Sequence, residues 1–450
     1  MTTSLLWSAL LTWEGRCKPH FIVLGVSHIF SRWGSRYDHG DPKVRENLIY
    51  FAMDKLLFGD VNITEGLSSA QAYAVLSQRV ALDINMPQYL FWGKSTNVMY
   101  AKESEQITNH MRVCVAIHDN IESLHGVASS EPILSEVASQ IMLTNGFSLH
   151  RTLSVVLSGY CVNQGERGEL IVSSFFTWAR DQVIGGKSGN QGYLCRHFSV
   201  CELFDKLFRG ASEILGEGGP SIYQDPDDLG KPFNEVFKNT NMHFNHMIRP
   251  HDQKALRRSN LLLFMARGAA ALGANGQPGF DAVYPFLYGT TNLDIRKVGF
   301  VIVQTKNDPR QGLKQVPDIL EKMDPFACKL IDEIDKEDGR FPIPIIRIVF
   351  LVSSYDGPCF EQVPSPSGTN SLFTSYDYVC IGIDPKILGP IEASSAQSWQ
   401  TLVNKREPWE SLYKVDEASI LRTQIPGGGS NSEHYTSWMD EDSLLKRYSS

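Results

Sequence analysis

The feature that most constrains this chain is an apolar run that ends in polar side chains. The run reads VGFVIV from Val298 to Val303, and QTKN follows from Gln304 to Asn307. A continuous apolar run of this kind predicts a central strand that is buried on both faces. Gln304 and Lys306 are two residues apart, so a strand projects both side chains to the same face. Such polar groups lower stability unless they are hydrogen-bonded or used, so the strand end is a candidate site.

The segment before this strand supplies an acidic side chain. It reads QPGFD from Gln277 to Asp281 and continues into an apolar stretch, which predicts a turn followed by a strand over residues 280–288. Asp281 would then stand at the mouth of one strand, with Gln304 and Lys306 at the end of the next. An acid, an amide or second acid, and a lysine are the groups that hold a divalent metal and a phosphate together.

This pattern resembles the PD-(D/E)xK nuclease superfamily, and more narrowly its Gln-x-Lys branch, seen in type IV methyl-directed restriction endonucleases. It is also similar to the nuclease-like module of large fungal proteins related to Crinkler-type effectors. In that module a Gln-Pro-x-x-Asp turn precedes a Gln-x-Lys-Asn strand end, as residues 277–281 and 304–307 do here. The resemblance covers about residues 130–390. It implies an α/β (α+β) fold with a restriction-endonuclease-like α-β-β-β-α-β core and a mixed central sheet.

The resemblance also implies a function, which is Mg²⁺-dependent hydrolysis of phosphodiester bonds in DNA, with DNA preferred to RNA. Asp281 would be a direct metal ligand, and Gln304 would offer an amide oxygen where most relatives carry Glu or Asp. Lys306 would orient or acidify the attacking water and stabilise the pentacoordinate phosphate. Glu169, on the first helix of the core, would contact the metal through water. Glu166 lies one helical turn earlier and is an alternative to it.

Each of these side chains also has an ordinary structural explanation. Asp281 can cap its own turn, Gln304 can bond to backbone, and Lys306 can extend to solvent. Glu166 or Glu169 can interact with the helix N-terminus. Because Gln304 brings no charge, a catalytically degenerate nuclease fold that binds nucleic acid or a protein is the alternative function.

Basic residues for phosphate contact precede the motif. A helix predicted over residues 252–272 carries Lys254, Arg257 and Arg258 as a compact positive patch, with Arg249 before it and Arg267 near its end. The formal net charge of the chain is −8, so a nucleic-acid site must be a local basic patch rather than a general coat. A solvated helix face is the alternative interpretation.

The length of 450 residues and the hydrophobic content of 42% predict a globular chain of two or three domains. Residues 1–125 read as a mostly helical accessory region, which the resemblance relates to the tail of an upstream ATPase module. Residues 126–395 read as the nuclease-like domain, with a Gly-rich insertion at 185–240. A C-terminal extension follows at 396–426, and a disordered polar tail at 427–450.

Hydrophobic periodicity and turn signals predict the individual elements. Helices are expected at residues 42–51, 68–84 (with Ser69 as N-cap), 130–145, 149–157, 166–181, 200–209, 252–272 and 311–334, and strands at 241–248, 280–288, 299–305, 345–353 and 378–383. With the insertion removed, the order from Glu166 onward is α-β-β-β-α-β.

Composition argues against several other classes of protein. The eight cysteines form no C-x-x-C pair, which favours a reduced, intracellular thiol set. The first residues lack the basic start of a signal peptide, and no uninterrupted apolar run reaches the roughly 18 residues of a spanning helix. We therefore expect an intracellular protein, in the cytoplasm or nucleus, without a membrane partner. A regulatory interaction protein that uses residues 1–125 and 185–240 is a further alternative.

Overall fold

The computed structural model describes the chain in segments, and all structural statements below concern these segments. They are residues 42–59, 66–82, 96–117, 124–128, 132–144, 147–159, 164–187, 197–250, 252–273, 278–337, 339–364 and 371–404. The chain divides into two compact units, residues 1–403 and 404–450, of which almost the whole described part belongs to the first. The predicted tail at 427–450 and most of the extension at 396–426 lie outside the described residues.

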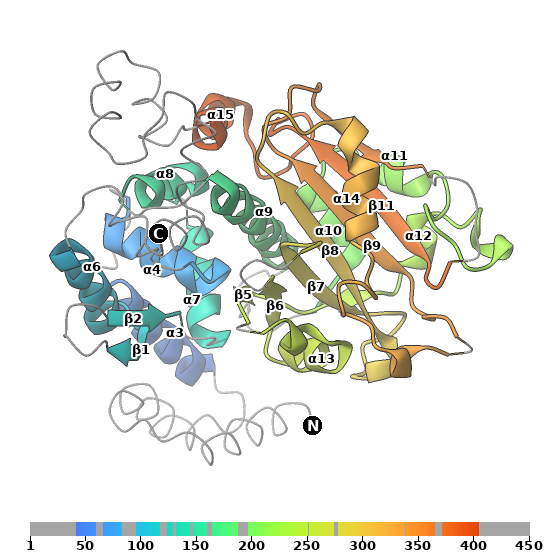
Figure 1. The fold of residues 1–450 in the computed structure, drawn as a ribbon. Helices are drawn as coiled ribbons and strands as arrows, with labels where there is room; N and C mark the ends of the chain where they lie inside the picture. Colours follow the sequence, from blue (N-terminus) through green and yellow to red (C-terminus); the bar gives the residue numbers. More distant parts are fainter. Residues whose placement is uncertain are drawn as a thin grey trace, which may run out of the picture. The chain divides into compact units, whose positions relative to one another are not determined.

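The N-terminal part of the described chain is mostly helical, as predicted (Figure 1). It comprises α3 (Pro42–Leu56), α4 (Ser69–Val80), α6 (Thr96–Asn109), the hairpin β1 (Val113–Ile117) and β2 (Leu124–Val127), α7 (Pro132–Met142) and α8 (Leu149–Gly159). The N-cap of helix α4 is Ser68 and not Ser69, and the helix ends at Val80, before the predicted end at residue 84. Ser68 and Gln71 exchange backbone-to-side-chain hydrogen bonds in a capping box.

The described strands other than β1 and β2 form one nine-stranded mixed sheet, which confirms the predicted α/β class with a mixed central sheet. Its main path runs β10 (Cys359–Gln362), β11 (Ser375–Ile381), β9 (Ile345–Leu351), β8 (Val298–Lys306), β7 (Ala282–Leu287), β4 (Asn241–Met242) and β3 (Phe198–Ser199). Strands β8, β9 and β11 are parallel, whereas β7 is antiparallel to β8. Strand β8 is buried from Val298 to Thr305, as its apolar run predicts.

Two short strands lie beside the start of β7. Strand β6 (Ala269–Leu272) pairs with β7 in antiparallel fashion, and β5 (His246–Ile248) pairs with β6 in parallel fashion. The single strand predicted over 241–248 is therefore divided into β4 and β5, which have different neighbours in the sheet.

The helix predicted over 252–272 is wrong in its second half. The structure has a short 3-10 turn, η2 (Gln253–Leu256), then α13 (Arg258–Ala266) and then β6. Gly268 adopts a φ of 69° and ends the helix, and the three alanines that follow are buried in the sheet. Alanine favours helix by local propensity, but its small side chain also lets strands and helices approach closely, and here the tertiary contact decides.

The helix predicted over 311–334 is much shorter than expected. Helix α14 spans only Val316–Lys322, after the 3-10 turn η4 (Leu313–Gln315). Asp324 then accepts hydrogen bonds from the backbone N–H groups of Phe326 and Ala327, which replaces the helix with a turn at Pro325. The remaining helices are α9 (Gln164–Lys187), α10 (Val200–Leu207), α11 (Ala211–Gly216), α12 (Phe233–Val236) and α15 (Ala396–Asn404), with short 3-10 turns at η1 (Pro226–Asp228), η3 (Ile295–Lys297), η5 (Glu333–Asp335) and η6 (Ala393–Ser395).

Helix α9 lies against the sheet and is the longest described helix (Figure 1). Its apolar stripe is buried, as the sequence predicts, and the ring of Phe176 stacks on Tyr284 of β7 at a centroid distance of 4.2 Å. The ring of the preceding residue, Phe175, makes an edge contact with Trp399 of α15 at a centroid distance of 5.0 Å. The helix therefore fixes its own rotation by aromatic packing against the sheet.

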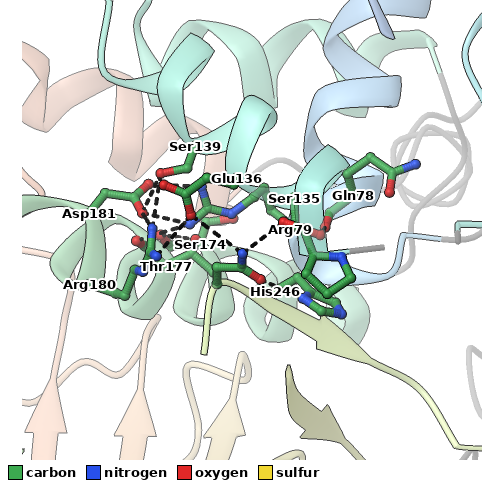
Figure 2. Close-up of polar contacts among 12 residues, drawn as sticks. Gln78, Arg79, Ser135, Glu136, Ser139, Ser174, Thr177, Arg180, Asp181 and His246 are labelled. Atoms are coloured by element: carbon green, nitrogen blue, oxygen red, sulfur yellow. Dashed lines mark hydrogen bonds and ion pairs between the residues drawn. The ribbon is translucent and has the colours of Figure 1, made fainter. Parts of the chain in front are cut away.

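A buried network of charges joins the N-terminal helices to α9 (Figure 2). The two terminal nitrogens of the Arg79 guanidinium, from α4, each donate to one carboxylate oxygen of Asp181 at 2.9 Å. Arg180 donates to Asp181 at 2.9 Å and to Glu136 of α7 at 3.0 Å. The Ser139 hydroxyl donates to Asp181 at 2.7 Å. These charged side chains are at most 2% exposed, so two cations and two anions balance each other without water.

The same network reaches strand β5. Asn245 donates to the Pro132 carbonyl at 3.0 Å and to Glu136 at 3.4 Å. The side-chain oxygen of Asn245 also lies 2.7 Å from Nδ1 of His246. Burial lowers the pKa of His246 to about 3, so its ring is neutral and adds no third cation.

We predict that Arg79→Met lowers the free energy of unfolding by about 3–5 kcal/mol, because it leaves Asp181 buried with one cation fewer. Equilibrium unfolding in urea at neutral pH measures the change. Arg296→Met is the control, since Arg296 is 75% exposed and pairs with Asp294 on the surface. If Arg79→Met lowered the free energy of unfolding by no more than Arg296→Met does, the network would have no role in holding α4 to α9.

Candidate functional site

The sheet brings the sequence-predicted residues to one edge. Strands β5 and β6 run parallel, β7 runs against β6, and β8 runs against β7. The carboxyl ends of β5, β6, β8 and β9 therefore meet the start of β7 at the same edge. Asp281 directly precedes β7, and Gln304 to Lys306 form the end of β8.

Asp281 and Gln304 are in direct contact. Ala282 pairs with Val303, and the Asp281 N–H donates to the Val303 carbonyl at 2.8 Å, so the next pair across the strands is Asp281 and Gln304. The Gln304 amide nitrogen donates to Oδ2 of Asp281 at 2.7 Å, and the Thr305 N–H donates to the same oxygen. These two donors fix the orientation of the carboxylate.

Helix α9 brings Glu169 to this edge through a close contact with the end of β8. Gln164 and Asn307 exchange hydrogen bonds, at 2.6 Å from the Gln164 amide to the Asn307 carbonyl and 2.8 Å in the reverse direction. A Cβ atom at Gly168 would lie 2.9 Å from Cβ of Asn307 and 3.2 Å from Cγ2 of Thr305. Only glycine permits this approach of helix to strand.

The electrostatics of Glu169 reflect its neighbours. Burial first, and then the carboxylates of Asp281 and Glu166, raise the pKa of Glu169 to about 7, although the cations of Arg249 and Lys306 lower it. Glu169 therefore lies near Asp281 and near Glu166, the other glutamate that the sequence offers for this role.

Asp281 shows the same combination of causes. Burial raises the pKa of Asp281 to about 6, although the Thr305 N–H, the Lys306 ammonium, the Gln304 amide and the Arg249 guanidinium all lower it. Two acids with raised pKa values and two cations in one place form an arrangement that costs folding free energy, and such clusters gather at functional sites.

Arg258 does not join Lys254 and Arg257 on the surface, where the sequence predicts a basic patch. Lys254 lies exposed in η2, and Arg257 pairs with Asp332 at 3.5 Å. Arg258 is buried, donates to the carbonyls of Val298 at 3.0 Å and Arg296 at 2.7 Å, and stacks over Phe341. The expectation that Arg258 contacts phosphate is therefore wrong. Its bonds go to η3, to the start of β8 and to Asp335 at 3.4 Å, at the opposite edge from Asp281.

Sequence reasoning missed Gln164 and Gly168 as parts of the site, and it named Arg249 only as one of several basic residues for phosphate contact. A glycine inside a strongly apolar helix was the available signal for Gly168. Asn307 ties the helix to the strand. Nothing local marks Arg249, because its place depends on the pairing of β5 with β6.

The donors of this site fit a hard divalent ion under one condition. Mg²⁺ is usually held by one or two carboxylates and keeps several waters, and Asp281 with Glu169 supply that number. The Gln304 amide presents its nitrogen to Asp281, so its oxygen would face a shared ion only after the amide turns over. Among the described residues, no three His, Cys, Asp or Glu side chains form a metal-holding group.

Comparisons with known proteins add no identification. The chain matches no protein-family model, no curated protein and no solved structure. Within the described part of the chain, no helix combines the length and apolar character needed to cross a membrane.

We predict that Gly168→Ala destabilises the fold by about 1–3 kcal/mol, because the added methyl group overlaps Asn307 and pushes α9 from β8. Gly185→Ala on the same helix is the matched control, since its Cβ would meet Leu143 at an ordinary 3.8 Å. That change is expected to be neutral or to stabilise by up to about 1 kcal/mol. Urea unfolding of both variants decides; equal effects would show that the helix does not approach the strand closely.

We predict a pH dependence of stability that Glu169→Gln reduces. The folded-state pKa of Glu169 lies near 7, above its ordinary value of 4.5, so the folded state holds its proton more tightly than the unfolded state does. This contribution to stability is full below about pH 4.5 and is lost as the pH rises through 7. Unfolding measured at several pH values should show wild-type stability falling more than that of Glu169→Gln across this window. Parallel curves would place Glu169 in an ordinary, solvated environment.

Proposed function

We propose that this chain contains a nuclease domain of the PD-(D/E)xK type, which hydrolyses phosphodiester bonds in DNA with a divalent ion such as Mg²⁺. The observation that carries the proposal is the meeting of Asp281, Gln304, Glu169 and Lys306 at one sheet edge. Asp281 and Gln304 are hydrogen-bonded at 2.7 Å, and Glu169 and Asp281 are both influenced by the Lys306 cation.

The order of elements supports the same proposal. Helix α9 is followed, after an insertion that ends with β5 and α13, by β6, β7 and β8, then by α14 and β9. This is an α-β-β-β-α-β order, as in a restriction-endonuclease-like core, but its first strand is β6, whereas the sequence-based order takes its first strand from residues 241–248. Asp281 precedes the second of these strands, and the Gln304-to-Lys306 segment ends the third.

The residues divide the work of hydrolysis among them. A bound divalent ion neutralises the charge that develops on phosphate and acidifies water. Asp281 and Glu169 would hold it, and Gln304 would add a neutral oxygen. Before an ion binds, hydrogen bonds from Gln304 and Thr305 keep the Asp281 carboxylate in one orientation. Once the Gln304 amide turned its oxygen to the ion, the Thr305 N–H would retain this role. The Lys306 ammonium would donate to the attacking water or to a phosphate oxygen.

A second function has one observation in its favour. Gln304 stands where a carboxylate is usual, and its amide already satisfies Asp281 without a metal. A degenerate domain that binds nucleic acid or a protein partner without cleavage would retain this arrangement. Calorimetric titration with Mg²⁺ and Mn²⁺ separates the two, because only the hydrolytic function requires saturable metal binding.

We predict that the purified chain nicks supercoiled plasmid DNA in the presence of Mg²⁺ or Mn²⁺, and that chelation by EDTA stops the reaction. Lys306→Ala should lower the rate by about 100-fold or more, because it removes a charge-stabilising donor. Lys297→Ala, directly before the opposite end of the same strand, is the control and should cleave normally. Equal cleavage by Lys306→Ala and wild type would remove Lys306 from the mechanism. A wild-type protein without metal binding or cleavage would overturn the hydrolytic proposal.

A further inference from the structure

Arg249 enters the candidate site from a part of the chain far from the nuclease-like motif. It directly follows β5, in which Ile248 pairs with Ala271 of β6. In turn, Leu272 pairs with Ala282 of β7, and the Gly273 N–H donates to the Asp281 carbonyl at 2.7 Å. The end of β5 therefore lies at the edge where β7 begins and β8 ends.

The charge of Arg249 acts on both acids of the site. Its guanidinium lowers the pKa of Asp281 and of Glu169, and no basic residue of the predicted patch is among the causes of either shift. The side chain is half-buried and its Nε atom is enclosed by protein. The inner part of the Arg249 side chain is therefore buried while its charge acts on the site, whereas Lys254 and Arg257 are exposed.

The segment that carries Arg249 is anchored from both sides. The Asn245 N–H donates to the Gly268 carbonyl at 2.7 Å, and its side chain reaches Pro132 and Glu136 of the buried network. His246 is buried beside it and bonded to Asn245 at 2.7 Å. A short strand held in this way fixes the place where Arg249, the residue directly after it, leaves the sheet.

We propose that Arg249 is a phosphate-binding residue of this site, which contacts a phosphate of the bound nucleic acid next to the acids and Lys306. The proposal rests on the proposed function, because it requires a phosphodiester substrate. A guanidinium matches a phosphate with two parallel N–H···O bonds, so it both binds and orients the group. Among the basic residues weighed from the sequence, Arg249 replaces Arg258, whose donors are used at the opposite edge.

A binding experiment tests this role without depending on catalysis. Fluorescence anisotropy would follow a short labelled DNA duplex with wild type, Arg249→Gln, Arg249→Lys and Arg296→Gln, in EDTA and over about 50–200 mM salt. Arg249→Gln should weaken binding about tenfold and reduce the salt slope by about one. Arg249→Lys should keep the salt slope but lose part of the affinity, because it lacks the second hydrogen bond. Arg296→Gln removes the same charge at the opposite edge and should bind as wild type does.

The outcomes separate this proposal from the proposed function. If wild type and Arg249→Gln bind DNA equally, Arg249 only balances the acids and the proposal is overturned, while the nuclease function stands. If Arg296→Gln loses as much as Arg249→Gln, binding is general attraction to positive charge, which also overturns it. If wild type does not bind DNA even at low salt, both fall. Thermal unfolding confirms that each variant is folded, and Arg249→Lys carries the test if Arg249→Gln does not fold.

Discussion

The ion pair between Arg79 and Asp181 is the contact on which the arrangement of the helices and the sheet depends. It lies where water does not reach, and it shares its charges with Arg180 and Glu136. Removing ions from water costs several kcal/mol each, so such a network gives little net stability. The network instead selects one arrangement of the helices, because any other placement of α4 or α7 against α9 would leave a buried charge unpaired. The network therefore specifies one position for α9 more than it strengthens the fold.

Helix α9 passes that position on to the candidate site. Its later turns carry Arg180 and Asp181, and its first turns carry Gly168 and Glu169. The contact of Gly168 with Asn307 closes the other end against β8. The N-terminal helices and the sheet are thus connected through one rigid helix, and Glu169 is placed by contacts at both of its ends.

The two acids of the site, Asp281 and Glu169, lower the stability of the fold. Burial raises the pKa of both Asp281 and Glu169, which means that their charged forms are held at a cost. Lys306 and Arg249 offset part of this cost, whereas a pair of apolar residues would avoid it. A local violation of this kind is expected where a protein must bind or react, and it is the physical reason to treat this edge as functional.

The sequence predicted the centre of this site because its parts obey local rules. The buried run of β8, the shared face of Gln304 and Lys306, and the acid at the start of the preceding strand all follow from strand periodicity and hairpin pairing. The sequence did not predict contacts between segments that are far apart in the chain. Arg79 and Asp181 lie 102 residues apart in the chain, and the Arg258 guanidinium is buried by η3 and β8 in a way that its helix alone does not indicate. The alanines of β6 were misassigned because helix propensity and close packing favour the same residue.

The central claim is that Asp281 and Glu169 share one charged site. It is tested most directly by NMR titration of the side-chain carboxyl carbon of Glu169 in wild type and in Asp281→Asn. We expect a wild-type pKa of about 7 for Glu169, which falls when the neighbouring carboxylate is removed and stays unchanged in Asp294→Asn at the opposite edge. A Glu169 that titrates in the ordinary range of a solvated glutamate, or whose pKa ignores Asp281→Asn, would contradict it.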